Sequence, residues 1–244
     1  MAESLSVDPN LSFAAADVFC YSIIMDQEIL SLLQNAQHLG IELNEQQLTQ
    51  CDVYQKELLL WNAKTNLISE KSSKEIVSRH FLDSLTALQF IDKPQARIVD
   101  IGCGAGFPGL PLKIAAPELA LYLLESNRKK MSFLKYIVRI LNLSQTFFLH
   151  DRVENLMQEN KWQGFFDIVV TRAAFKLPEL LPYAAFFLAE GGKFIALKGW
   201  DIEEELSQGA ELAGRYVFSE LFQYDIDNKF LGNPRKIIIG EKIK

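Results

Sequence analysis

The sequence has few of the residues that cross-link small or extracellular domains. Its three cysteines, Cys20, Cys51 and Cys103, are widely separated and odd in number, and its three histidines are equally scattered. This spacing excludes a disulfide framework and a zinc-ribbon pattern, because both need paired ligands at short intervals. We therefore expect a protein of a reducing compartment that holds no structural metal.

Long apolar runs are also missing. No stretch reaches the roughly 18 residues that a membrane-crossing helix needs. Residues 1–10 carry no basic cluster, and the mildly apolar stretch that follows contains Asp17, so the start makes a poor secretory signal. We expect a cytoplasmic protein that makes no contact with a membrane.

Basic residues are in the minority, with 25 lysines and arginines against 31 acidic residues and a net charge of −6. This balance excludes a globally basic nucleic-acid binder but leaves room for a locally basic face. The hydrophobic fraction of 49% is enough for a folded core and excludes a disordered chain.

The chain divides into three parts by its hydrophobic pattern. At about 150 residues per domain, its length predicts between one and two domains. Residues 1–25 lack clear periodicity and are expected to form a tail or one added helix. Residues 26–94 show helical spacing only, with helices expected from Asp26 to Gly40, over about Asn44–Asn62, and from Ser73 to Pro94.

Residues 95–244 alternate between strand and helix signals. Strands are expected at Arg97–Ile101, Leu119–Glu125, Thr146–His150, Asp167–Arg172, Lys193–Lys198, Tyr216–Tyr224 and Lys236–Gly240. Helices are expected at about Gly109–Ala116, Arg128–Leu141, Pro178–Leu188 and Asp201–Ala213. This alternation predicts an α/β fold with a mainly parallel sheet, and such sheets bind ligands beyond the carboxyl ends of their strands.

The most informative segment is the glycine-rich run from Asp100 to Gly109, which follows the first expected strand. Glycines at 104, 106 and 109 satisfy the GxGxxG pattern of dinucleotide-binding loops. Glycines at 102, 104 and 106 equally fit the GxGxG loop of S-adenosylmethionine-dependent methyltransferases. The glycine count therefore leaves both a methyltransferase and an NAD(P)-dependent oxidoreductase open.

The acidic residues around this loop favour the methyltransferase. Asp100 ends the first expected strand, where a carboxylate can order the loop or attract a positive methionyl amine but would repel a pyrophosphate. Glu125 ends the second expected strand, where a carboxylate accepts hydrogen bonds from ribose hydroxyls of either cofactor. An oxidoreductase would also need a proton-donor set such as Tyr-x-x-x-Lys, and none is visible.

A longer series of motifs carries a family resemblance. The motifs are, in order, Trp61-Asn62, Asn66-Leu67, Arg79-His80-Phe81-Leu82-Asp83-Ser84-Leu85, Gly102 to Pro111, Leu124-Glu125-Ser126, Arg128-Lys129-Lys130, Phe133-Leu134, Arg152-Val153-Glu154, Thr171-Arg172-Ala173 and Ala196 to Gly199. The chain resembles the 16S ribosomal RNA guanine-N7 methyltransferases, the glucose-inhibited division protein B family. The resemblance is strong from Trp61 to Gly199 and weak on both flanks.

The resemblance implies a Rossmann-like methyltransferase domain, S-adenosylmethionine as methyl donor, and transfer to N7 of a guanine in 16S rRNA. It implies cofactor contacts at Gly102, Phe107, Val153, Glu154 and Arg172. The loop analysis adds Asp100, Gly104 and Glu125 as cofactor-binding residues. Cys103, Phe107 and Glu125 differ from the commonest family residues, but each keeps the chemistry. The partner is expected to be 16S rRNA or the small ribosomal subunit, and the protein a monomer.

The chemistry explains why no catalytic triad is visible. Guanine N7 has an exposed lone pair and no hydrogen, so its attack on a sulfonium methyl group needs no general base. The enzyme has to position and desolvate the reactants. Arg172 and Lys198, at the ends of two expected strands, are the candidates for positioning the substrate. A small-molecule methyltransferase stays open as an alternative and predicts a closed, apolar acceptor pocket.

Overall fold

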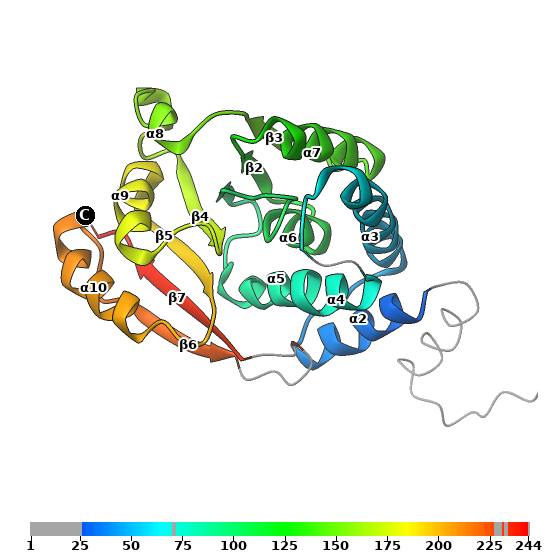
Figure 1. Cartoon of the computed structure of the whole chain (residues 1–244). Helices are drawn as coiled ribbons and strands as arrows, with labels where there is room; N and C mark the ends of the chain where they lie inside the picture. The colour runs from blue at the N-terminus through cyan, green and yellow to red at the C-terminus, as the bar shows by residue number, and fades with distance from the viewer. Residues whose placement is uncertain (1–25, 70–71, 227–230, 232–233, 244) are drawn as a thin grey trace, which may run out of the picture.

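The structure, a computed structural model, describes residues 26–69, 72–226, 231 and 234–243. The expected tail at residues 1–25 lies outside these ranges. A central sheet is flanked by helices on both faces, as Figure 1 shows. Its strands are β1 (Arg97–Ile101), β2 (Ala120–Leu124), β3 (Thr146–Leu149), β4 (Phe166–Arg172), β5 (Leu188–Lys198), β6 (Phe222–Ile226) and β7 (Arg235–Glu241).

The strand order is β3-β2-β1-β4-β5-β7-β6. The first five strands pair in parallel, and β7 and β6 add an antiparallel edge. Order along the sheet reverses between β1 and β4, so the carboxyl ends of these two strands flank the crevice where such folds bind ligands. The expectation of an α/β fold with a mainly parallel sheet is confirmed.

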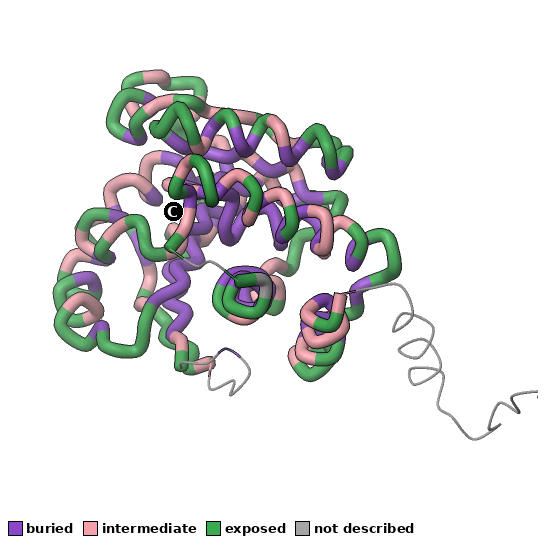
Figure 2. The backbone as a smooth tube through the Cα atoms, turned by 45° about the vertical axis from the view of Figure 1, so that its right-hand side comes forward, coloured by how far each residue is buried: buried purple, intermediate pink, exposed green. Residues whose placement is uncertain are grey.

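Alternate residues of each strand face two separate hydrophobic cores. On β1, Ile98 belongs to one cluster of buried side chains and Val99 to the other. The first core lies under α6 (Gly109–Ala115), α7 (Arg128–Ile140) and the helices before β1, and the second under α8 (Val153–Leu156), α9 (Leu177–Phe187) and α10 (Glu203–Ala213). Figure 2 shows buried backbone through the middle of the molecule and exposed backbone on the outer helices.

The two helices α2 (Gln27–His38) and α3 (Glu45–Thr65) begin at polar residues that cap them. Asp26 caps α2, and Asn44 caps α3 in a reciprocal pair with Gln47. Side chains of this region share the first core with the sheet, for example Leu58 of α3 and Ile168 of β4. Residues 26–94 therefore pack on the sheet and do not form a separate core.

The third expected helix departs from a regular α-helix. It comprises α4 (Ser73–Ile76), a π-helical turn at Val77–Leu82, α5 (Asp83–Leu85) and a 3₁₀ turn at Thr86–Phe90. Wide π turns of this kind are often found at functional sites. This turn carries Arg79 and His80, two residues of the RHFLDSL motif.

Two expected strand boundaries are wrong. β5 begins at Leu188, not at Lys193, and runs through Gly191-Gly192. The two glycines stay in the sheet because Gly191 N donates to Lys242 O at 2.9 Å and Lys242 N donates to Gly192 O at 2.8 Å. The strand expected at Tyr216–Tyr224 begins only at Phe222, because Val217 takes a left-handed conformation (φ 57°) after a 3₁₀ turn at Gly214–Tyr216.

The short helix α8 and a 3₁₀ turn at Asn160–Trp162 were not expected, since each is about one turn long and shows no periodicity. No helix within the described residues is both long and apolar enough to cross a membrane.

One tyrosine joins α3 to the glycine-rich loop. The Tyr54 hydroxyl donates to the carbonyl oxygen of Ala105 at 2.6 Å, and both residues are buried. The Tyr54 ring stacks on Phe107, with centroids 5.3 Å apart and planes 11° apart, and meets the edge of Phe81 at 5.1 Å. The helical region therefore supports the loop between β1 and α6 directly.

We expect Tyr54→Phe to lower the free energy of unfolding by about 1–3 kcal/mol, because the buried Ala105 carbonyl loses its donor. Urea unfolding monitored by circular dichroism measures this change. Tyr136→Phe is the matched control, since the Tyr136 hydroxyl donates to Glu57 at 2.9 Å near the surface and does not contact the loop. Equal losses in the two variants would contradict a special role for Tyr54.

Candidate functional site

Buried Asp100 holds the loop that follows β1. Its Oδ2 accepts a hydrogen bond from the Gly109 amide at 2.7 Å, so the end of β1 is tied to the first turn of α6. Its Oδ1 has no hydrogen-bond partner in the structure. Burial raises the pKa of Asp100 to about 7, although the Gly109 bond and the charge of Arg172 oppose the rise. The carboxyl group orders the loop, which was one of its two expected roles.

The loop has glycines at positions with a positive φ. Gly102 has a φ of 70°, and a Cβ there would lie 2.8 Å from Cβ of Ala174, on the turn after β4. Gly104 has a φ of 61°, and a Cβ there would meet only Nζ of Lys130, 3.9 Å away. Gly102 thus allows close packing against the β4 turn, and Gly104 has open space beside it for a ligand.

Glu125 connects the loop to the next strand. Its Oε2 accepts from the Gly104 amide at 3.0 Å, and its Oε1 accepts from the Asn127 amide at 2.7 Å. Each carboxylate oxygen can accept a further hydrogen bond, and ribose hydroxyls need acceptors of this kind. The side chain is therefore both a clamp on the loop and a candidate for binding a nucleoside.

A cavity of about 240 Å³ lies beside Glu125, over the carboxyl ends of β1, β2 and β3. Its lining includes Gly102, Glu125, Val153 and Glu154, all of which were expected to bind the cofactor. Ile101 and Leu124 add apolar walls. An acidic hydrogen-bond acceptor, exposed loop backbone and apolar walls fit the adenosine part of S-adenosylmethionine.

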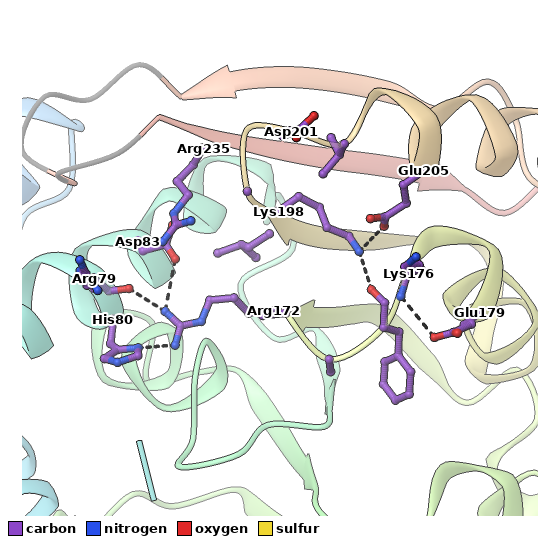
Figure 3. A pocket seen from close by; sticks show the side chains of 16 residues that line it. Arg79, His80, Asp83, Arg172, Lys176, Glu179, Lys198, Asp201, Glu205 and Arg235 are labelled. Atoms are coloured by element: carbon purple, nitrogen blue, oxygen red, sulfur yellow. Dashed lines mark hydrogen bonds and ion pairs between the residues drawn. The ribbon is translucent and has the colours of Figure 1, made fainter. Parts of the chain in front are cut away.

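A second, larger cavity of about 770 Å³ lies at the carboxyl ends of β4 and β5. Figure 3 shows the charged side chains that line it, including the expected positioning residues Arg172 and Lys198. The five basic residues of the lining are Arg79, Arg172, Lys176, Lys198 and Arg235. The four acidic residues are Asp83, Glu179, Asp201 and Glu205.

Arg172 joins β4 to the π-helical turn. Its guanidinium Nη1 donates to the Arg79 carbonyl at 2.8 Å and to Asp83 Oδ2 at 3.2 Å, and its Nη2 contacts Nδ1 of His80 (Figure 3). It also lies over the Phe107 ring, 5.2 Å from the centroid. The guanidinium is thus held in one orientation at the wall of the second cavity.

Two further ion pairs hold the rim of this cavity. Arg235 of β7 places its Nε 3.3 Å from Asp83 Oδ1, so one buried carboxylate faces two arginines. Burial raises the pKa of Asp83, while both arginines lower it. Lys198 Nζ donates to Glu205 Oε1 and to the Phe175 carbonyl, so Lys198 also has its partners within the protein.

The expected site residues separate into three groups. Gly102, Glu125, Val153 and Glu154 line the smaller cavity, and Arg172 and Lys198 line the larger one. Asp100, Gly104 and Phe107 line neither cavity, and they shape or support the loop. Phe107 is buried and stacks on His80, with centroids 4.7 Å apart. Arg172 was expected to contact the cofactor or to position the substrate, and it lines the larger cavity.

Sequence reasoning did not single out Phe175 for this site, and it did not place Arg235 beside Asp83. Phe175 follows β4 by three residues, so the rule that ligands bind after strand ends could have found it. Arg235 comes from an antiparallel edge strand, and no sequence pattern indicates that it reaches Asp83.

Two further observations concern metal binding and the Cys103 thiol. No cluster of three or more histidine, cysteine, aspartate or glutamate side chains in the described ranges could hold a metal ion. Burial raises the pKa of the Cys103 thiol, and the carboxylates of Asp100 and Glu125 raise it further. A thiol that resists ionisation is a poor nucleophile, so Cys103 packs as a small residue of the loop.

Solved structures define the class of fold. The structure is similar to magnesium protoporphyrin IX methyltransferase from Synechocystis PCC 6803, with a TM-score of 0.54 and 13% identity over 78% of this chain and 97% of that one. It is also similar to M. jannaschii TYW2, with a TM-score of 0.52 and 16% identity over 73% of this chain and 78% of that one. The fold is thus the Rossmann-like fold of S-adenosylmethionine-dependent methyltransferases.

Sequence comparison then gives the family. The profile of the family described as GidB, rRNA small subunit methyltransferase G, matches residues 47–229. The "Ribosomal RNA small subunit methyltransferase G" of Syntrophus aciditrophicus is 43% identical over 74% of this chain and 76% of its own length. That of Alkaliphilus oremlandii is 39% identical over 87% of this chain and 90% of its own length. The chain belongs to the rRNA small subunit methyltransferase G family.

We expect Glu125→Gln to weaken S-adenosylmethionine binding about 10- to 100-fold, because charge-assisted hydrogen bonds contribute about 1.5–3 kcal/mol each. Isothermal titration calorimetry measures the dissociation constant. Glu118→Gln, a change at an exposed residue outside both cavities, is the control and should bind the cofactor as the parent does. Unchanged affinity in Glu125→Gln would remove Glu125 from the cofactor site.

The raised pKa of Asp100 predicts a pH-dependent stability. As pH rises above about 4, the unfolded chain releases this proton, but the folded chain keeps it until about pH 7. The contribution of Asp100 to the free energy of unfolding therefore falls across this window and is constant above it.

Between about pH 5 and about pH 8, the parent should lose on the order of 2 kcal/mol relative to Asp100→Asn, whose amide oxygen can still accept from Gly109. Urea unfolding at the two pH values measures the difference. The exposed Asp225→Asn variant serves as control and should follow the parent. Parallel pH curves for the parent and Asp100→Asn would contradict a raised pKa.

Proposed function

We propose that the protein transfers a methyl group from S-adenosylmethionine to N7 of a guanine in the 16S rRNA of the small ribosomal subunit. Membership of the rRNA small subunit methyltransferase G family supports this assignment. Within the structure, the main support for this assignment is the pair of adjoining cavities. One has an acidic nucleoside-binding edge at Glu125, and the other is larger, polar and rich in basic side chains.

The chemistry needs little from side chains. S-adenosylmethionine supplies an electrophilic methyl group on a sulfonium that leaves as a neutral thioether. The N7 lone pair forms the new bond to carbon, the electrons of the broken bond stay on sulfur, and no proton moves. The work of the protein is then to hold the cofactor and guanine in line and to exclude water.

The described residues divide this work between the two cavities. Glu125 and the loop from Gly102 would hold the nucleoside, with Val153 and Glu154 at its far edge. Arg172 and Lys198, at the ends of β4 and β5, would position the guanine base and the RNA backbone beside it. Both cations are held by buried contacts, so they need no reorganisation when the substrate binds.

The lining of the larger cavity favours RNA over a small apolar acceptor. A small-molecule methyltransferase would need a closed, apolar pocket, whereas ten of the sixteen lining residues here carry a charged or imidazole side chain. Five basic and four acidic side chains line this cavity, and this small local excess of positive charge can attract a phosphate backbone even though the net charge of the chain is −6.

Residues 26–94 also contribute side chains to the larger cavity. We infer that residues 26–94 form a helical part that contacts RNA beside the methyltransferase domain of residues 95–244, because Arg79 and His80 of the π-helical turn line the same cavity as Arg172. We also infer that the protein acts as a monomer in the cytoplasm. The covering of both sheet faces by its own helices supports the monomer.

A methylation assay tests the assignment. The protein is incubated with methyl-labelled S-adenosylmethionine and with small subunits or naked 16S rRNA from a strain that lacks the enzyme, and the label is mapped. We expect label on one guanine, as 7-methylguanine, and an initial rate that falls steeply with salt. Label on another base atom would refute the N7 assignment, and no label on either substrate would refute RNA as the acceptor.

Binding of the cofactor separates the remaining alternative. Calorimetry should detect S-adenosylmethionine binding and no binding of NADH, since the carboxylate of Glu125 lies beside the loop where a pyrophosphate would lie. Binding of NADH alone would instead support an oxidoreductase.

A further inference from the structure

One aromatic side chain lies where the two cavities adjoin. Of the residues that the structure describes, Phe175 alone lines both the cavity beside Glu125 and the cavity beside Arg172. A methyl group passing from a cofactor in the first cavity to an acceptor in the second must cross near this side chain. Phe175 is half-buried.

The backbone around Phe175 holds this position. Ala173 has a φ of 55°, a left-handed conformation that is uncommon for alanine and turns the chain sharply at the end of β4. The turn brings Ala174 and Phe175 against Gly102, where an added Cβ would lie 2.8 Å from Cβ of Ala174 and 3.5 Å from Cε2 of Phe175. Non-glycine residues in this conformation are concentrated at functional sites.

Contacts on two sides fix the residue further. The Phe175 ring meets the Tyr183 ring edge to face, with centroids 5.3 Å apart, and the Tyr183 hydroxyl donates to Glu154 at 3.0 Å. The Phe175 carbonyl accepts from Lys198 Nζ at the end of β5. The ring is thus supported from the cofactor side, and its backbone is held from the acceptor side.

We propose that Phe175 is the stacking surface for the acceptor guanine and sets the angle at which N7 faces the cofactor. The inference rests on the proposed function and adds the residue that orients the base. Base–aromatic stacking suits a base displaced from its helix, because it replaces the lost stacking on neighbouring bases. The methylated base is a cation, so an aromatic face also favours the charge that develops during transfer.

The alternative role for Phe175 is contact with the cofactor, since it lines that cavity too. The two roles predict changes in different measured constants. A stacking surface for guanine affects kcat and the KM for RNA, whereas a contact with the cofactor affects the dissociation constant of S-adenosylmethionine.

The experiment compares Phe175→Leu and Phe175→Tyr with the parent on small subunits that lack the modification. We expect Phe175→Leu to lower kcat/KM for the RNA about 5- to 150-fold, the range given by loss of one base–aromatic stack. Its dissociation constant for S-adenosylmethionine should stay within about twofold of the parent value. Phe175→Tyr, which keeps the aromatic face, should retain most of the activity. Phe147→Leu, a change at an exposed aromatic residue on the edge strand β3, is the control.

Fluorescence gives a second measurement that does not depend on turnover. In Phe175→Trp saturated with S-adenosylhomocysteine, 7-methylguanosine monophosphate should quench the added indole more than guanosine monophosphate does, because a cationic base stacks more strongly. The parent protein, with Trp61, Trp162 and Trp200, provides the baseline.

Each outcome decides between the two roles. Unchanged RNA kinetics in Phe175→Leu, weaker cofactor binding with unchanged kcat, or no quenching in Phe175→Trp would overturn the proposal. If Phe175→Leu fails to fold, the quenching result decides. Absence of RNA methylation by the parent would instead refute the proposed function, so the two failures are distinguishable.

Discussion

The hydrogen bond between the buried carboxyl group of Asp100 and the Gly109 amide is the constraint on which the site depends. It ties the end of the central strand β1 to the start of α6 at 2.7 Å, and the loop between them is left to face the crevice. Glu125 then holds the same loop from β2 through the Gly104 amide. Two carboxylates from neighbouring strands therefore shape one loop, and the smaller cavity lies beside it.

The helical region contributes to this arrangement from the other side of the loop. Tyr54 donates to Ala105 within the loop, and Phe107 is enclosed by Tyr54, Phe81 and His80. Farther along, Asp83 faces Arg172 of β4 and Arg235 of β7, so a single buried carboxylate links three distant parts of the chain. Residues that an RNA could contact are thus coupled through direct contacts to residues that shape the cofactor loop.

Much of the fold and the position of the glycine-rich loop could be predicted from local signals. Asn44 marks the start of α3, alternating strands and helices indicate the parallel sheet, and the glycine run after Arg97–Ile101 indicates the cofactor loop. These features depend on backbone preferences of neighbouring residues. Gly191-Gly192 lie in β5 although the strand is expected only from Lys193, because hydrogen bonds to Lys242 hold them in the sheet, and such long-range bonds leave no trace in the local pattern. The π-helical turn at Val77–Leu82 could not be predicted either, because no spacing of residues in the sequence indicates it.

The amino-acid sequence alone was enough to indicate the class of protein. The glycine loop, the two strand-end carboxylates and the motifs through Gly199 are each formed by residues that are neighbours in the chain, so they can be recognised without the fold. The division of labour among those residues needed the folded molecule. Phe107 and Arg172 look alike as candidates for cofactor contact, yet one is buried under His80 and the other faces the larger cavity. Packing between distant segments decides these positions, and the adjoining of two cavities at Phe175 arises from the same long-range contacts.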